Sequence, residues 1–470
     1  MAAVMLQGVS AKTVMAHFMV SNAYAYDENE WYKDIVAAQD MGIDGFVLNM
    51  MPFYCGSDTS WVKGQVDSAY KVSQHEGFML MPSFDMSNLN CPFGTSWNVT
   101  GISDMVYRYK DSNATYRWNG QSLVTTYGGE SYPYGNDFFA QLKDNMADLG
   151  HPIVLSPALV SIAEGAQPIA NDVDSAIAAA NASAHKLIND YPAIDGFTNW
   201  QAWPLQDQNI TNHPDNAFME QVKGASGKTG PYIMGVSPWQ FKDLNDPSKG
   251  LPWVAYSDTL FSQRFQQLIN ADIDHQPDII ELLTWNDFCE SHYLRDLPSP
   301  NVGAKDYIEV TGDMNDYIQG MDHSPWRIMA KYYISWWKNK DMTRPVVTED
   351  QVIFWHRLHP KASTCAVGSQ FVRNSNEPVD AVFAWALVKQ AATISMSVGS
   401  NEFWTFSADG SGPVTNMVPF PDYIPDSGIS PEVAIMRNGR TQYVTKSAMP
   451  ITNYCARTNF NPIVNLVGTS

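Results

Sequence analysis

The sequence predicts an α/β fold, a (β/α)8 barrel followed by a small β-sandwich domain. Between residues 13 and about 340, eight short apolar runs alternate in order with amphipathic helical patterns, the arrangement of a parallel barrel. After Pro345 the helical periodicity stops, and short strand-like runs are separated by Gly, Pro, Asn and Asp. We therefore divide the chain into a barrel, residues 1–343, and an all-β domain, residues 344–470.

The predicted strands of the barrel are almost continuously apolar, which is typical of a parallel sheet covered on both faces. They are residues 13–20, 45–50, 78–86, 122–129, 152–159, 194–203, 231–241 and 278–287. The helical patterns span residues 28–42, 61–77, a stretch from about 100, 136–150, 174–192, 215–224, 258–272 and 324–340. A doubly wound open sheet is the alternative, but eight units and the lack of a glycine-rich fingerprint after the first strand favour the barrel.

The connection between the two predicted domains, DMTRPV, is short and contains no Gly/Ser tract. So short a linker allows little independent motion, because reach grows only as roughly 5–6 Å times the square root of the residue number. We expect the β-domain to be fixed against the barrel by an apolar interface that includes the aromatics of FWHRLH and NEFWTF. Residues 407–431 are expected to form a long loop or an irregular edge.

Charge and hydropathy exclude several classes of partner. The chain has 29 basic and 49 acidic residues, a net charge of -20, which argues against binding to nucleic acid or to an anionic membrane surface. There is no apolar stretch of about 18 residues that could span a bilayer. We expect a monomer that acts without a cofactor.

Four N-x-S/T sequons, at Asn98, Asn113, Asn181 and Asn209, favour a secreted, extracellular glycoprotein. The first residues lack a basic region, so we expect the signal peptide to be absent from this sequence. Five cysteines leave at least one outside any intrachain disulfide. We predict the pairs Cys55–Cys91 and Cys365–Cys455, with Cys289 left over.

Chemistry in such a barrel collects at the carboxyl ends of the strands. Three carboxylates stand there and are candidate catalytic residues: Asp85, Asp287 and Glu290. Neutral polar and aromatic residues at the same ends resemble a sugar site, where flat sugar faces lie on aromatic rings and polar groups bind hydroxyls. These candidate substrate-binding residues are His17, Asn49, Trp200, Trp239, Trp285, Asn286, His292 and Tyr293.

Each of these residues has a plainer interpretation. Asp85 could cap a short helix, since SFDMSN is capping chemistry. One of the other two acids could be a solvated loop residue, and the tryptophans and His17 could belong to the core. A divalent metal bound by the same histidines and carboxylates is a rival, but no metal-spacing motif such as H-E-x-x-H occurs. A G-x-S-x-G nucleophile elbow is also absent.

Two carboxylates at one rim suit glycoside hydrolysis. One carboxylic acid protonates the leaving oxygen, while a second carboxylate activates water or attacks directly. The sequence does not choose between these alternatives. The same aromatics would also suit a carbohydrate-binding protein without activity, or a hydrolase of another polysaccharide.

The blocks AHFMV, GIDGFVLN, SFDM, GVSPW and WND-x-x-ES-H occur in this order, and the chain resembles glycoside hydrolase family 71, the fungal α-1,3-glucanases or mutanases. The resemblance implies secretion, a barrel with a β-sandwich, and cleavage of α-1,3-glucan with inversion. It places the essential acids on Asp85, Asp287 and Glu290. Cys289 is a departure, because relatives usually carry Gly there.

Within this resemblance we assign Glu290 as the general acid, kept partly protonated by an apolar neighbourhood that includes Trp285 and Tyr293. Asp287 is assigned as the base that activates water. Asp85 is expected to bind a sugar hydroxyl or to stabilise positive charge in the transition state.

Overall fold

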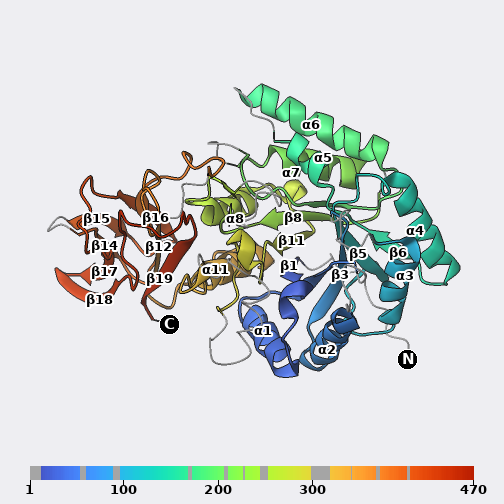
Figure 1. Cartoon of the computed structure of the whole chain (residues 1–470), viewed down its shortest axis with the longest axis horizontal. Coiled ribbons are helices and arrows are strands. Elements are labelled where there is room, and N and C mark those ends of the chain that lie inside the picture. The colour runs from blue at the N-terminus through green and yellow to red at the C-terminus, as the bar shows by residue number, and fades with distance from the viewer. Residues whose placement is uncertain are drawn as a thin grey trace.

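The computed structural model is dominated by a curled mixed sheet whose long strands run parallel, followed by two smaller antiparallel sheets (Figure 1). It describes residues 12–52, 60–87, 96–167, 172–205, 210–225, 228–243, 252–297, 318–339, 341–366, 371–399 and 403–469. All eight strands predicted for the barrel are present, most of them shorter than the apolar runs that contain them.

The parallel strands of the curled sheet follow one another along the chain. They are β1 (Thr13–Met19), β2 (Gly45–Met50), β3 (Met79–Asp85), β5 (Gln121–Tyr127), β6 (Ile153–Leu155), β7 (Phe197–Asn199), β8 (Tyr232–Val236) and β11 (Ile279–Leu282). The hydrogen-bonded order is β5-β3-β2-β1-β11-β8-β7, with β6 beside β5 and the short antiparallel β4 (Arg117–Trp118) at the edge. Between β6 and β7, backbone bonds join Gly196 N to Leu155 O and Thr198 N to Pro157 O, both at 3.1 Å.

Helices cover the outside of this sheet, largely where the amphipathic patterns predict them. They are α1 (Glu28–Asp40), α2 (Ser60–Glu76), α3 (Val99–Arg108), α4 (Asn136–Asp148), α5 (Val160–Gly165), α6 (Val173–Asp190), α7 (His213–Met219), α8 (Leu260–Asn270) and α11 (Trp326–Lys338). Asp27, Asn98 and Asp172 cap α1, α3 and α6 by accepting a backbone N–H three residues later. The short α5 was not predicted.

The inside of the curled sheet changes from apolar to polar toward the carboxyl ends of the strands. Inward positions alternate along each strand, and seven of them form one buried apolar cluster: Met15, Val47, Met81, Leu123, Val154, Ile233 and Ile279. Two residues further along, the inward positions include His17, Asn49, Ser83 and Glu281, all buried. The fold therefore places a polar floor beneath the ends of the strands.

A small antiparallel pair, β9 (Phe241–Lys242) and β10 (Trp253–Val254), follows β8 and was not predicted. Its strands are only two residues long, too short to produce a periodic pattern. The pair matters because it carries Lys242 into the site described below.

The C-terminal part contains two four-stranded antiparallel sheets. The first has the order β16 (Val414–Pro419), β13 (Ala381–Leu387), β12 (Gln351–Arg357), β19 (Pro462–Gly468), and the second β15 (Phe403–Ala408), β14 (Ala392–Ser397), β17 (Glu432–Arg437), β18 (Arg440–Lys446). They share one apolar core, to which Phe354 of the first and Ile394 of the second contribute, consistent with the predicted sandwich. The expectation of a loop over residues 407–431 is wrong in part, because β16 lies there as an edge strand with little burial to mark it.

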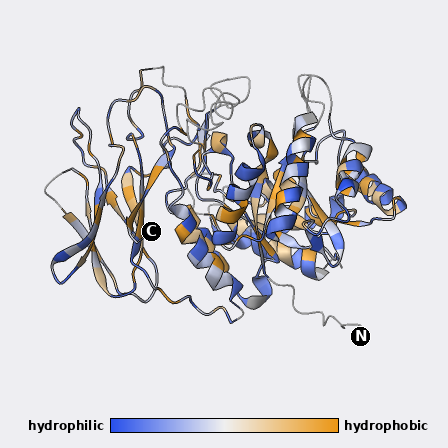
Figure 2. Cartoon of the chain, turned by 90° about the horizontal axis from the view of Figure 1, so that it is seen from below, coloured by the Kyte–Doolittle hydropathy of each residue, from blue (hydrophilic) through white to orange (hydrophobic). Residues whose placement is uncertain are grey.

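The C-terminal sheets pack against α8 and α11, which lie between them and the curled sheet (Figure 1). Trp355, Phe383 and Trp385 belong to the same apolar cluster as Trp326 and Tyr333 of α11. In Figure 2 the hydrophobic colour is concentrated in the central strands and the inner strands of the C-terminal sheets. The predicted apolar interface is present.

The second aromatic segment expected in that interface is not part of it. Phe403 and Trp404 of β15 are 63% and 54% exposed. They lie on an edge strand of the sheet farther from α11, so the barrel is out of their reach.

Cys365 and Cys455 form the predicted disulfide, and Cys289 carries a thiol. Cys55, Cys91 and Asn209 lie outside the described residues. The three sequon asparagines within them, Asn98, Asn113 and Asn181, are exposed. Among the described helices, none is long and apolar enough to cross a membrane.

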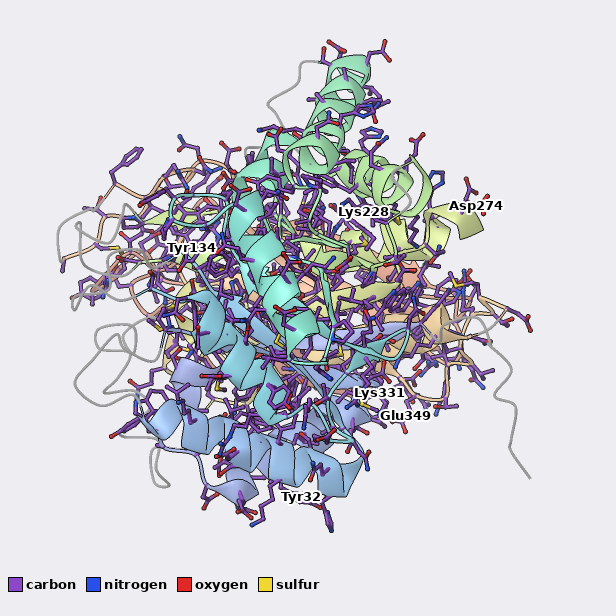
Figure 3. The ribbon with its side chains drawn as sticks, turned by 90° about the vertical axis from the view of Figure 1, so that its right-hand side faces the viewer. Tyr32, Tyr134, Lys228, Asp274, Lys331 and Glu349 are labelled. Carbon is purple, nitrogen blue, oxygen red and sulfur yellow. A yellow bond between two sulfur atoms is a disulfide. The ribbon has the colours of Figure 1, made fainter. Side chains whose placement is uncertain are left out.

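A groove of about 600 Å³ lies between α1, α11 and the connection to the C-terminal sheets. Lys331 and Glu349, both labelled in Figure 3, contribute to its wall. None of the candidate site residues lines it, so this groove is separate from the site that the strand ends form.

Candidate active site

The segment after β11 turns sharply at the carboxyl end of the curled sheet. A single 3-10 turn, Phe288–Glu290, follows Asp287, and Ser291 adopts a left-handed conformation with φ of 61°. The hydroxyl of Thr284 accepts the backbone N–H of Asp287 at 2.9 Å. These local bonds direct Asp287 and Glu290 toward the same space above the polar floor.

Glu290 lies among charged and polar side chains, not in the apolar setting that the sequence predicted. Its Oε1 accepts from Nζ of Lys242 at 2.9 Å, and its Oε2 lies 3.2 Å from Nε2 of Gln240 and 3.1 Å from Nε2 of His292. Burial by itself would raise the pKa of Glu290, but the charge of Lys242 and the contacts with His292 outweigh burial and hold that pKa well below its usual range. Glu290 is therefore the ionised member of the site.

Asp287 has the opposite electrostatic setting. It is buried, and burial followed by the charge of Glu290 raises its pKa. The thiol of Cys289 donates to Oδ1 of Asp287 over 2.9 Å. Burial also raises the pKa of Cys289 well above its usual value, so the thiol stays a neutral donor. The two neighbouring carboxyls are thus driven toward different protonation states, the pattern of an acid–base pair.

The two carboxyls are close together. One oxygen of Asp287 and one oxygen of Glu290 lie within 4.8 Å of each other and of a ring nitrogen of His292. Carboxyl separations are about 5–5.5 Å in retaining glycosidases and roughly 6.5–9.5 Å in inverting ones. The 4.8 Å limit joins one oxygen of each carboxyl and not the centres of the two groups, so it is compatible with either reaction.

Asp85 ends β3 and belongs to the same group of acids. Its Oδ1 accepts from the backbone N–H and the hydroxyl of Ser87, at 3.0 and 2.6 Å. Burial raises its pKa, and the charge of Asp287 adds to that rise. The alternative in which Asp85 caps a helix concerns a segment, residues 88–95, that lies outside the described residues.

Trp200 is the one predicted sugar-binding tryptophan that stays at the site. It follows β7, is half-buried, and meets the ring of His17 edge-on at 4.6 Å and the ring of Tyr127 at 4.8 Å. Burial and then the charges of Glu290 and Asp85 raise the pKa of Tyr127. Trp200 therefore lies beside the carboxylates, where a sugar ring could rest on it.

Two other tryptophans predicted to bind substrate are buried in the core instead. Trp239 is 1% exposed and donates its indole N–H to the backbone oxygen of Phe460, at the junction with the C-terminal sheets. Trp285 is fully buried and packs on Phe46 at 5.4 Å. These predictions are corrected: both tryptophans lie three residues beyond the ends of β8 and β11, where the backbone has left the strand and its alternation no longer turns a side chain toward the interior.

Asn286 and Tyr293 are likewise structural. The side-chain amide of Asn286, fully buried, bonds both the N–H and the carbonyl of Met19, at 2.7 and 3.1 Å, and so ties the segment after β11 to the end of β1. Tyr293 is fully buried and donates its hydroxyl to the carbonyl of Met321 at 2.5 Å. Neither side chain can contact a substrate in this arrangement.

The remaining three predicted residues, His17, His292 and Asn49, lie close to the site but are buried below its surface. His292 is fully buried, stacks on Trp203 at 5.2 Å and contacts Glu290, so it holds the carboxylate and not the sugar. Asn49 is 2% exposed on β2, and its amide oxygen has no hydrogen-bond partner among the described residues.

Asp287, Glu290 and His292 converge closely enough to hold a metal ion. The ammonium of Lys242, however, already contacts Oε1 of Glu290. A fixed positive charge at that position opposes a divalent cation. The geometry therefore favours acid–base chemistry over a metal centre.

Among known families, the profile of glycosyl hydrolase family 71 matches residues 10–470. The chain belongs to glycosyl hydrolase family 71. It is 29% identical over 438 residues to a glucan endo-1,3-alpha-glucosidase of Schizosaccharomyces pombe, with 92% of this chain and 89% of that protein covered.

A second relative is a mutanase of Penicillium rubens, 26% identical over 461 residues, with 96% of this chain and 88% of the mutanase covered. Among solved structures, the family 71 chain is distantly similar to the GH99 endo-alpha-mannosidase from Bacteroides thetaiotaomicron. The identity is 13%, the TM-score is 0.43, and 69% of this chain and 82% of that one are covered.

Four residues of the family 71 site were missed by the sequence analysis: Gln240, Lys242, Tyr127 and Glu281. Glu281 carried a usable signal, because it is an acid in the middle of the apolar run IIELL. Tyr127 stood at the end of a predicted strand. Lys242 and Gln240 gave no such signal. Lys242 ends the two-residue β9 and Gln240 directly precedes it, and so short a strand produces no periodic pattern in the sequence.

Proposed function

We propose that this family 71 chain is a glucan endo-1,3-alpha-glucosidase that hydrolyses the α-1,3-glucosidic bonds of fungal or microbial wall glucan. One relative is named a glucan endo-1,3-alpha-glucosidase and another a mutanase. The observation that supports the proposal most is the pair of Asp287 and Glu290, in which the surroundings raise one pKa and lower the other. Glycoside hydrolysis requires such a pair, one carboxyl protonated and one ionised.

The wider architecture belongs to the same proposal. Residues 1–343 would form a complete (β/α)8 barrel that carries the site, and residues 344–470 a β-sandwich fixed to its wall. Asp85 would bind a sugar hydroxyl or stabilise positive charge, and Trp200 would support a sugar ring. The protein would act outside the cell as a monomer.

The electrostatic setting reverses the roles that we assigned from the sequence. Asp287, whose pKa is raised, would protonate the leaving oxygen, and Glu290, held ionised by Lys242, would activate water. Asp287→Asn should recover activity on α-glucosyl fluoride, whose leaving group needs no proton. Glu290→Gln should instead recover activity when azide replaces water as the nucleophile. If azide recovered Asp287→Asn and α-glucosyl fluoride recovered Glu290→Gln, Glu290 would be the acid and Asp287 the base, as assigned from the sequence.

Inversion is the expectation from the family resemblance, and the approach of single oxygens of the two carboxyls to within 4.8 Å is compatible with either outcome. Proton NMR of the sugar released in the first minutes distinguishes the two outcomes. We expect the β-anomer from α-1,3-glucan. The α-anomer would show a retaining reaction, in which the ionised Glu290 acts as the nucleophile.

The activity itself is tested with a panel of insoluble α- and β-glucans, by measuring the reducing ends released. We expect release from α-1,3-glucan, and a loss of about 10²–10⁴-fold in kcat for Asp287→Asn and Glu290→Gln. Binding to the glucan without release would show a carbohydrate-binding protein. Release from another glucan only would show a hydrolase of different specificity.

Glu30 offers a matched control for Glu290. Its side chain is 25% exposed, against 21% for Glu290, and it too contacts two cationic groups, Lys33 and Arg295. It lies on α1, at the outside of the barrel. Glu30→Gln should therefore leave kcat unchanged.

A further inference from the structure

A carboxylate and an imidazole are paired inside the barrel, directly above its apolar cluster. Glu281 lies on β11 and His17 on β1, each two residues beyond a member of that cluster. Oε1 of Glu281 is 2.7 Å from Nδ1 of His17, and both residues are 1% exposed. The mechanism proposed above gives Glu281 no role.

Stability does not explain this pair. Nε2 of His17 and Oε2 of Glu281 are buried and have no hydrogen-bond partner among the described residues. Buried polar atoms left without a partner cost free energy. Replacing a buried ion pair by apolar side chains of similar volume is often neutral or stabilising. An ion pair that adds no stability and leaves two buried polar atoms without partners points to a role in binding the substrate.

The geometry defines which atoms are available for that task. An ionised carboxylate can only accept hydrogen bonds, so the proton of the imidazole that faces it is on Nδ1. Glu281 thereby fixes both the tautomer and the orientation of His17. The ring edge of His17 meets the partly exposed indole of Trp200, and Nε2, on the side of the ring away from Glu281, remains as an acceptor without a partner among the described residues.

Building on the proposed function, we propose that Glu281 is a positioning residue for the sugar site. It holds His17 so that Nε2 of His17 accepts a hydrogen bond from one bridging water, which in turn binds a hydroxyl of the glucosyl unit beside Trp200. The bridge is needed because neither side chain reaches the surface. A buried water requires two to four polar partners, and Nε2 and the sugar hydroxyl supply two.

The test compares variants by oligosaccharide affinity, kinetics and thermal stability. Dissociation constants for an α-1,3-gluco-oligosaccharide are measured by calorimetry in the inactive Glu290→Gln background, and kcat and KM in the otherwise native chain. The double variant Glu281→Leu/His17→Phe removes both polar atoms without leaving an unpaired charge. Glu281→Gln keeps an acceptor for Nδ1 of His17. Ser156→Ala is the control, since Ser156 is also buried after an inner strand and its hydroxyl reaches only the backbone of Pro231.

We expect the double variant to bind the oligosaccharide about 3- to 10-fold more weakly, the usual effect of losing one neutral hydrogen bond. Its melting temperature should equal or exceed that of the parent chain. Glu281→Gln should keep most of the affinity, and Ser156→Ala all of it.

Unchanged affinity in the double variant would overturn the inference. So would an equal loss in Ser156→Ala, because the effect would then belong to any polar change in the interior. Absence of hydrolysis by the parent chain would overturn the proposed function instead, and the calorimetric comparison would still decide the role of Glu281.

Discussion

Lys242 has a larger influence on the chemistry of the site than any neighbour of the carboxylates that the sequence suggested. Its ammonium contacts Glu290, and the charge of Glu290 in turn raises the pKa of Lys242. The lysine therefore stays charged and keeps Glu290 ionised. As the base proposed above, Glu290 should consequently remain active in acid, where an ordinary glutamate would be protonated.

Lys242→Met should move the acidic limb of the pH–rate profile to higher pH. Without the cation the pKa of Glu290 rises, so more of the base is protonated and inactive at low pH. The limb is measured from kcat/KM between pH 3 and about 8, a range that includes the reference pKa of Glu.

Lys143→Met is the control, because Lys143 is 31% exposed against 30% for Lys242 and forms its own ion pair, with Asp195, at the other end of the strands. An unchanged limb in Lys242→Met, or an equal shift in both variants, would contradict the role given to the lysine.

Asp258 is a buried carboxylate that lies outside the candidate active site. Its Oδ2 accepts the N–H of Val379 at 2.7 Å, its backbone carbonyl accepts from Trp355, and burial raises its pKa to about 6. Because the folded pKa is raised, ionisation of Asp258 costs stability as pH rises from about 4 toward 6, and the full cost persists above that range.

Asp258→Asn should therefore gain stability relative to the native chain as pH rises. The difference in free energy of unfolding should grow between pH 4 and about 6.5 by up to about 3 kcal/mol, and then level off. Thermal melts at half-unit pH steps measure this curve. A difference that is flat with pH would mean that the buried carboxyl titrates as it does in water.

The β9–β10 pair is the element through which the C-terminal sheets reach the site. Beside Lys242, Asp243 accepts from Arg457 at 3.0 Å, and the rings of Phe241 and Phe460 meet at 5.7 Å. Arg457 and Phe460 lie in the loop that follows Cys455, which a disulfide fixes to Cys365. The loop thus supports the strand that holds Glu290 in place.

Arg457→Met should lower kcat/KM several-fold by loosening β9. Arg437→Met is a close control, because the Arg437–Asp350 pair is 17% and 2% exposed and the Arg457–Asp243 pair 15% and 3%. Breaking either partly buried pair should lower the melting temperature to a similar extent. Only Arg457→Met should reduce activity, and equal activity of the two variants would show that the loop does not act on the site.

At the scale of the whole molecule, one apolar cluster runs from the barrel into the C-terminal sheets. It includes Trp326 and Tyr333 of α11 together with Trp355 and Trp385 of the neighbouring strands. A shared core of this kind makes the two parts unfold together, because neither can separate without exposing large aromatic side chains to water.

We expect a single calorimetric transition for the full chain, with equal calorimetric and van't Hoff enthalpies. A chain ending at residue 343 should be insoluble or unfolded, since it would expose the aromatic face of α11. Two separate transitions, or a soluble and fully active truncated chain, would show that the C-terminal part is an independent appendage.

The sequence by itself determined most of the strands and helices of the curled sheet and the positions of the main carboxylates along the chain. Helical and strand periods are local properties, so all eight strands of the curled sheet could be predicted from them. The position of Asp85, Asp287 and Glu290 at strand ends followed from the same patterns and from the resemblance to a known family.

Only the tertiary structure decided what surrounds those acids. Lys242 is 48 residues from Glu290, and Glu281 is 264 residues from His17. Such contacts depend on how the sheet curls and on how the short β9–β10 pair folds over its end. Neither feature produces a periodic pattern in the sequence. The direction of Trp239 and Trp285 was undetermined because both lie just beyond the ends of β8 and β11, where the backbone turns and strand alternation no longer fixes which way a side chain points.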